Sequence, residues 1–184
     1  MNTLLIAEHN NETLADATVK AVTAAAQMGG ECHVLVAGSG CAAVADQAAK
    51  LDGVAKVLLA DDGQYEKQLA EPMAALVVGM ADNYATVASP ASTNGKNFMP
   101  RIAALLDCSQ ISDITAVIDA NTFERPIYAG NAIQTVKVTE AKKAVTIRST
   151  AFQAAGDGGS ASVEAAGAAD NPGLSEFVNE ELTK

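Results

Sequence analysis

The six residues Gly38-Ser39-Gly40-Cys41-Ala42-Ala43 match the spacing G-x-G-x-x-A that dinucleotide-binding proteins place between a strand and a helix. Glycines at these positions let a pyrophosphate approach the helix N-terminus, and a carboxylate after a later strand holds a ribose. Asp61, with Asp62 beside it, would supply that carboxylate. The motif follows the second predicted strand rather than the first, and Gly-Ser-Gly also forms ordinary tight turns. We therefore interpret it as a turn, and keep Gly38, Gly40 and Asp61 as an alternative site for NAD or an adenine nucleotide.

Gly95 and Lys96 lie in a predicted loop at the carboxyl end of a strand, and Arg101 lies early in the helix predicted to follow it. A phosphate-binding loop of the type G-x-x-x-x-G-K would need a glycine five positions before Gly95, and Ser or Thr after the lysine. Pro90 and Asn97 stand at those positions, so that motif is absent. We expect the two cations either to meet an anionic partner surface or to remain solvated.

The histidines and cysteines form no recognisable catalytic or metal-binding set. His9 follows the first predicted strand and His33 opens the second, and neither has a partner at ligand or general-base spacing. Cys32, Cys41 and Cys108 lie far apart, without a C-x-x-C pair, which indicates buried thiols in a reducing compartment. The sequence therefore predicts no catalytic residue and no metal site.

Up to Ser109, apolar runs alternate with segments of helical periodicity. The expected strands are 3–7, 33–37, 57–60 and 86–89. The expected helices are 14–25, 42–49, 72–80 and 97–106. Asn10 or Asn11 is expected to cap the first helix, and Gly29-Gly30 to end it. This alternation predicts an α/β fold: an open, mainly parallel twisted sheet of the Rossmann-like type with helices on both faces.

Beyond Ser109 the pattern changes to strands without intervening helices, which predicts a C-terminal strand extension. The expected strands are 114–118, 133–138 and 144–148, and we expect the last two to pair like a hairpin through residues 139–143. The α/β domain is therefore expected to span residues 1–153.

The remaining residues read as a flexible tail. Residues 154–173 are rich in Ala, Gly, Ser and Asp, which predicts a flexible linker. Residues 174–184 predict a short amphipathic helix, whose apolar side carries Leu174, Phe177, Val178 and Leu182. Such a helix is marginal alone and needs a surface to dock on. If that surface is missing, a partly open fragment is a further alternative.

The composition suits a soluble globular protein. A chain of 184 residues can bury roughly 70% of its unfolded surface without disulfides or metals. Hydrophobic residues make up 49% of it, and the net charge of −10 disfavours nucleic acid and anionic membrane surfaces as partners. The sequence shows no basic targeting segment and no long apolar run. The expected location is a bacterial cytoplasm, or the mitochondrial matrix for a processed eukaryotic form.

The segment ERPIYAGNA at residues 124–132 combines a charged turn, an aromatic hydroxyl and a small-residue run that leads into a strand. In one interpretation it is a structural turn, in which Gly130 adopts a left-handed conformation and Asn131 bonds nearby backbone. In the other, Arg125, Tyr128 and Asn131 lie at a subunit contact, where Arg and Tyr are favoured residue types. The sequence does not separate the two.

This segment also resembles the signature of electron transfer flavoprotein alpha subunits, in their N-terminal domain. The resemblance continues through GKNFMPRIA at residues 95–103 and LLIAEH at residues 4–9, and it covers nearly the whole chain in order. It implies a fold similar to that of the adenine nucleotide alpha hydrolases. The chain stops at Lys184, where such subunits continue into a second domain that carries the flavin.

The resemblance implies a role as an electron-carrier subunit rather than an enzyme. Members of the family are alpha–beta heterodimers that pass electrons from acyl-CoA and related dehydrogenases to a membrane quinone oxidoreductase. Their FAD is held mainly by the alpha C-terminal domain and an AMP by the beta subunit. The alpha N-terminal domain holds neither nucleotide and forms a base together with beta. We therefore expect residues 1–153 to be an assembly module without a flavin site, with Lys96, Arg101, Arg125, Tyr128 and Asn131 at the subunit interface.

Overall fold

The computed structural model describes residues 2–181 and contains two β-sheets. The strands are β1 (Asn2–Ile6), β2 (Cys32–Gly38), β3 (Val54–Asp61), β4 (Tyr84–Pro90), β5 (Gln110–Ile114), β6 (Ala116–Asp119), β7 (Thr122–Ile127), β8 (Ala132–Lys137), β9 (Lys143–Ile147) and β10 (Ser162–Ala165). Seven strands form one sheet in the order β10-β3-β2-β1-β4-β9-β5, in which every neighbouring pair is parallel. The other three, β6-β7-β8, form a small antiparallel sheet.

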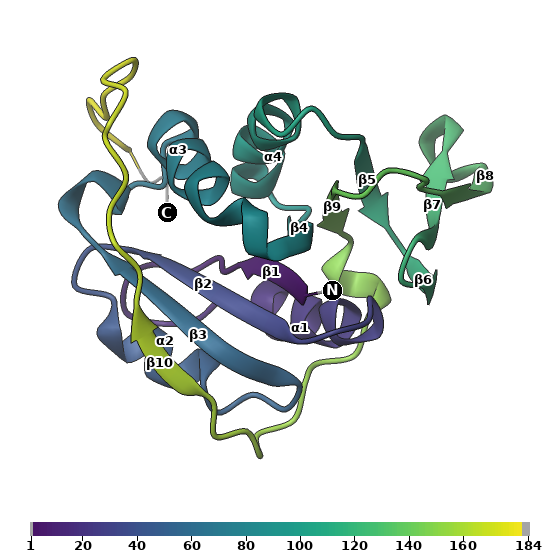
Figure 1. Ribbon diagram of the computed structural model, residues 1–184, viewed down its shortest axis with the longest axis horizontal. Coiled ribbons are helices and arrows are strands. Elements are labelled where there is room, and N and C mark those ends of the chain that lie inside the picture. Colours follow the sequence, from purple (N-terminus) through teal and green to yellow (C-terminus); the bar gives the residue numbers. More distant parts are fainter. Residues whose placement is uncertain (1, 182–184) are drawn as a thin grey trace.

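Helices cover both faces of the seven-stranded sheet (Figure 1). They are α1 (Asp16–Gln27), α2 (Ala42–Ala48), α3 (Ala70–Met80) and α4 (Thr93–Leu105). One buried cluster joins Leu5 and Val36 of the sheet to α1 and α2. The second joins Leu4 and Ile6 to α3 and α4. Neighbouring residues of β1 thus point into different clusters, as strand geometry requires. The predicted parallel α/β fold with helices on both faces is confirmed.

Local sequence signals set several helix ends. The Ser92 hydroxyl accepts a hydrogen bond from the Gly95 amide at 3.2 Å and so caps α4. Gly29, with a φ of 80°, follows the end of α1. The predicted asparagine cap of α1 is wrong, because the helix begins after Ala15 without a side-chain cap. Asn10 instead accepts hydrogen bonds from loop amides after β1, the shorter at 2.7 Å.

Helix α4 starts so close to the end of β4 that the position of Gly95 requires a glycine. A Cβ atom on Gly95 would overlap with the backbone carbonyl oxygen of Pro90 and would lie 2.7 Å from the Ser89 hydroxyl. The predicted loop at Gly95 and Lys96 is therefore the first turn of α4. Only a residue without a side chain fits here, for reasons of packing rather than of phosphate binding.

The predicted hairpin between the strands at 133–138 and 144–148 is wrong. Strand β8 pairs with β7, whereas β9 lies between β4 and β5 in the seven-stranded sheet. The burial of the two strands gives the reason. All five residues of β9 are buried, whereas β8 is mostly exposed. A strand that is apolar on both sides belongs inside a sheet covered on both faces.

Residues 154–173, predicted as an unstructured linker, contribute the edge strand β10, which pairs in parallel with β3. The chain before β10 runs along the end of α2 with backbone hydrogen bonds, including those from the amides of Gly159 to Lys50 and of Ala161 to Ala49. A Cβ atom on Gly159 would overlap with the Leu51 carbonyl oxygen. Backbone bonding and close approach order this segment, although its side chains bury little.

The helix predicted for residues 174–184 is not formed within the described residues, where 174–181 carry no helix and no strand. Leu182 lies outside them. This segment is held instead by side chains on and before α3. The Ser175 hydroxyl bonds to the Glu71 carboxylate at 2.6 Å, and the Lys67 ammonium lies 4.7 Å from the centre of the Phe177 ring. So short a helix is marginal without a packed face.

Candidate functional site

The three-stranded sheet projects from the body of the molecule as an arm (Figure 1). We call strands β6, β7 and β8, with the turn at Tyr128–Gly130, the arm. Its inner face is anchored by Phe123, which is fully buried and paired across the strands with Val117 and Val136. The arm is thus held to the domain by one apolar face, as a small antiparallel sheet needs to be.

The outer face of the arm, on the side opposite Phe123, mixes polar and apolar residues: Thr122 pairs with Lys137 and Glu124 with Thr135. On this face, Pro126 of β7 pairs with Ile133 of β8. The neighbouring pair, Arg125 with Gln134, belongs to the inner face, because successive residues of a strand point to opposite sides of the sheet. Ile133 is 58% exposed, and so is Ile118 at the end of β6. Both isoleucines are therefore in contact with solvent.

The tip of the arm is a strained turn. Tyr128 and Ala129 have φ angles of 49° and 54°, in the left-handed region that disfavours residues with side chains. Gly130 follows with a φ of 91°, and the Asn131 side-chain amide donates to the Tyr128 carbonyl oxygen at 2.9 Å. The predicted turn roles of Gly130 and Asn131 are confirmed. The turn leaves the Tyr128 side chain 79% exposed, next to the outer face.

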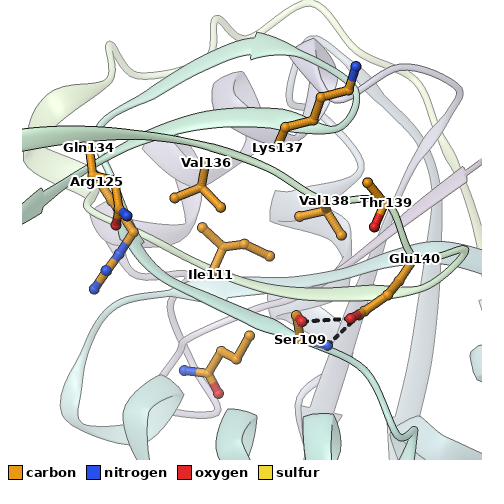
Figure 2. Close-up of a pocket in the computed structure, with 10 residues that line it drawn as sticks. Ser109, Ile111, Arg125, Gln134, Val136, Lys137, Val138, Thr139 and Glu140 are labelled. Carbon is orange, nitrogen blue, oxygen red and sulfur yellow. Dashed lines mark hydrogen bonds between the residues drawn. The ribbon is translucent and has the colours of Figure 1, made fainter.

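Arg125 points the other way, into a cavity of about 360 Å³ between β5 and the inner face of the arm (Figure 2). Its Nε donates to the Ser112 carbonyl oxygen at 2.9 Å. Glu140 closes the far end of this cavity, where its carboxylate accepts bonds from the Ser109 amide at 2.7 Å and hydroxyl at 2.8 Å. These bonds lower the pKa of Glu140. Arg125 therefore ties the arm to the domain rather than lying on the outer face.

The predicted interface cations of α4 lie elsewhere and apart from each other. Arg101 pairs with Glu71 of α3 at 3.2 Å. Lys96 lines a cavity of about 360 Å³ at the carboxyl ends of β4 and β9, together with Asp113 and Arg148. Asp113 and Arg148 form an ion pair, and hydrogen bonding to Arg148 lowers the pKa of Asp113. Of the predicted interface residues, the structure brings only Tyr128 and Asn131 together.

The Gly38–Ala43 loop is a closed turn whose amides are already bonded. The Ser39 amide donates to Asn11 Oδ1 at 3.0 Å, and the Gly40 amide donates to Asp61 Oδ1 at 2.6 Å. A Cβ atom on Gly38 would overlap with the Asn11 side chain, which with His9 fills the space a pyrophosphate would enter. The loop as folded therefore does not fit NAD, FAD or another dinucleotide. Asp61 holds the turn rather than a ribose.

The histidines and cysteines have structural environments. His9 Nδ1 accepts from the Asn11 amide at 3.1 Å, and burial lowers the His9 pKa, so the ring is neutral and already bonded. His33 lies 2.9 Å from the Tyr84 hydroxyl. Burial raises the pKa of Cys32 to about 12. Within residues 2–181, no group of His, Cys, Asp and Glu side chains is arranged to hold a metal ion.

The outer-face residues Ile118, Pro126 and Ile133 are the ones that the sequence interpretation missed. Ile118 and Ile133 lie in predicted strands, where an isoleucine is equally typical of a buried core, and Pro126 lies in the segment interpreted as a turn. Only the pairing of the strands shows which face is bare, so no local signal would have identified them. Among residues 2–181, no helix has the length and apolar composition needed to cross a bilayer.

Comparison with known proteins agrees with the resemblance found in the sequence. The model of the electron transfer flavoprotein domain matches residues 3–171. The chain is 55% identical to the electron transfer flavoprotein subunit alpha of Pseudomonas aeruginosa and 59% identical to that of Bradyrhizobium diazoefficiens, in both cases over all of its length. A probable mitochondrial alpha subunit of Caenorhabditis elegans is 42% identical over the whole chain.

The chain spans 60%, 59% and 56% of the lengths of these three relatives. All of them are named as subunits of an electron carrier. The match extends through both sheets and into the segment after β10, so it covers the arm as well as the seven-stranded sheet. The chain belongs to the electron transfer flavoprotein domain family, and within it the chain is similar to the alpha subunits.

Proposed function

We propose that this chain is the assembly module of an electron transfer flavoprotein, and that it binds a beta subunit through the outer face of the arm. In this proposal the redox cofactor, FAD, is bound outside residues 1–184. The complete complex would carry electrons from acyl-CoA and related dehydrogenases to a quinone oxidoreductase, in a bacterial cytoplasm or a mitochondrial matrix. The chain itself would contribute binding surface and no catalytic residue.

The observation that carries this proposal is the exposure of large apolar and aromatic side chains on the outer face and at the tip of the arm. Ile118 and Ile133 are each 58% exposed, and Tyr128 at the adjacent tip is 79% exposed. Burial of these exposed side chains against a partner removes apolar surface from water and so contributes free energy to binding. Aromatic residues such as Tyr128 are enriched among those that contribute most at subunit contacts.

The shape of the arm suits a subunit contact better than a small-molecule site. The outer face is a projecting sheet surface rather than a hollow, and the cavities of the arm lie on its inner side, where Arg125 occupies one of them. Small ligands prefer concave pockets, whereas protein partners cover exposed faces. The closed Gly38–Ala43 turn gives no support to the alternative of a nucleotide-binding protein.

The test is binding of purified beta subunit to the chain and to two variants, measured by isothermal titration calorimetry. Ile133→Asp places a charge on the outer face, so we expect binding at least about tenfold weaker, because that factor needs only 1.4 kcal/mol. Leu105→Asp is the matched control, since Leu105 is 56% exposed on α4, away from the arm. Circular dichroism would check that both variants fold. Equal affinity of Ile133→Asp and the unchanged chain would contradict the proposal.

A further inference from the structure

Lys143 is a buried lysine with little to balance its charge. It opens β9 and is only 3% exposed. Its Nζ donates to the side-chain oxygen of Asn121 at 2.8 Å, a neutral partner. Within residues 2–181 it takes part in none of the ion pairs of the structure. An ammonium group that is removed from water without a paired carboxylate is costly, which favours the neutral amine.

The Lys143 side chain lines a cavity of about 330 Å³ at the amino end of the seven-stranded sheet. Part of its wall is apolar, formed by Met28, Ala85, Ala120 and Ala141. Asn121 also lines the cavity, so the bond that holds the amine is on its wall. The Lys143 side chain therefore borders a space large enough for a short aliphatic chain.

The charged groups around the amine do not cancel the effect of burial. Burial lowers the pKa of Lys143, and Asp119 opposes this from the exposed end of β6. Glu140 lines the same cavity, but its carboxylate is already bonded to Ser109. More of the amine is therefore unprotonated near neutral pH than for an ordinary lysine, and lysines desolvated in this way are activated nucleophiles.

We propose that Lys143 is a site of Nε-acylation by thioesters that carry a short aliphatic acyl group. The neutral amine attacks the thioester carbonyl carbon, an amide bond forms, and the carbon–sulfur bond breaks. The thiolate leaves, and the proton released by nitrogen passes to the thiolate or to solvent. The product is uncharged, so it removes the cost of the buried ammonium and places the acyl chain against the apolar wall.

Lys142 is a natural reference within the same chain. Its ammonium donates to the carbonyl oxygens of Ala81 at 2.6 Å and Tyr84 at 3.2 Å, and lies 3.9 Å from the Asp82 carboxylate. Lys142 therefore has oxygen atoms of three residues around its ammonium group, including a carboxylate, whereas Lys143 has one neutral side-chain partner. The two neighbouring lysines thus separate the effect of environment from that of sequence position.

The experiment is to expose the whole chain, alone and in complex with a beta subunit, to a limiting amount of the butyryl thioester of N-acetylcysteamine. Peptide mass spectrometry would follow acylation of each lysine near neutral pH and again in alkaline buffer. We expect Lys143 to react severalfold faster than Lys142 near neutral pH, because burial lowers the pKa of Lys143 and leaves more of its amine neutral. In alkaline buffer the difference should shrink.

Asn121→Asp tests the cause. A carboxylate within hydrogen-bond distance of the amine favours the ammonium form, so acylation of Lys143 should slow near neutral pH and recover in alkali. Circular dichroism would check that the variant is folded. The proposal would be overturned if Lys143 reacted no faster than Lys142, if it reacted only in denaturant, or if Asn121→Asp left its rate unchanged.

Discussion

The seven-stranded sheet and the arm are built from similar residues but differ in what covers them. Every residue of β2 is buried, because helices lie on both faces of the sheet around it. In the arm, Phe123 is the one fully buried residue, and it packs against the domain. The other face of the arm leaves Ile118 and Ile133 exposed. Helices cover both faces of the large sheet, whereas the outer face of the arm is left exposed. Stability should therefore reside in one region and binding in the other.

The largest effect on stability is expected from truncating the buried sheet. Leu5→Ala removes a fully buried side chain from the cluster under α1 and α2. The free energy of unfolding should fall by about 2–5 kcal/mol, from lost burial and the cavity left behind. Urea denaturation followed by circular dichroism would measure it. A loss below that range would mean that the sheet is not the stable region, and would break the comparison.

A second test concerns the close approach of α4 to the sheet. Gly95→Ala should lower the free energy of unfolding by about 1–3 kcal/mol, because the new methyl group overlaps with backbone at Pro90. Gly79→Ala is the matched control, since nothing lies within 4 Å of a Cβ atom there, and a glycine in a helix is replaced by alanine with a gain of about 0.5–1 kcal/mol. The same denaturation curves serve both variants. Equal effects would show that packing at Pro90 is not tight.

A smaller effect should come from the junction between β5 and the end of β9 in the large sheet, where Asp113 meets Arg148. The pKa of Asp113 is lowered, first by its hydrogen bond to Arg148. Stability from this pair is present above the ordinary carboxyl pKa, about 3.9, and is lost as the pH falls through the lowered value. Because both groups are partly exposed, the contribution should stay below about 1 kcal/mol.

Asp113→Asn is the check on that junction. Urea denaturation between neutral and strongly acidic pH should show a shallower acid loss for the variant than for the unchanged chain. If the two chains lost stability in parallel, the ion pair would not contribute to the acid response.

The smallest effect on stability is expected on the outer face of the arm. Ile133→Ala should change the free energy of unfolding by no more than about 0.5 kcal/mol, because its side chain is largely in solvent already. The same variant should weaken binding of the beta subunit measurably by calorimetry. A large loss of stability together with unchanged binding would reverse the roles assigned to the two regions.

The fold of the large sheet was accessible from the sequence because its signals are local. Continuous apolar runs such as LLI at residues 4–6, followed by helical periodicity and glycine stops, predict parallel strands with helices between them. The position of β9 was missed because strand order depends on contacts distant in sequence. Strand β10 was missed because its backbone, rather than its side chains, supplies most of the ordering, as the approach of Gly159 to Leu51 shows.

The candidate site was predicted only in part. Residue type suggested Arg125, Tyr128 and Asn131, and two of these lie at the tip of the arm, but Arg125 is turned inward to Ser112. Sequence alone does not tell the inner face of a short strand from the outer when both carry apolar residues. The G-x-G-x-x-A spacing is present, yet Asn11 occupies the amide that a phosphate would need.

Hydrogen exchange of the chain with and without a beta subunit tests the central claim most directly, because it reports on both regions in one measurement. The account predicts that amides of β7, β8 and the turn at Tyr128–Gly130 become protected when the beta subunit is added, while those of β1 and β2 exchange slowly in both samples. Protection elsewhere on the molecule, with the arm unchanged, would contradict the assignment of the arm as the binding surface.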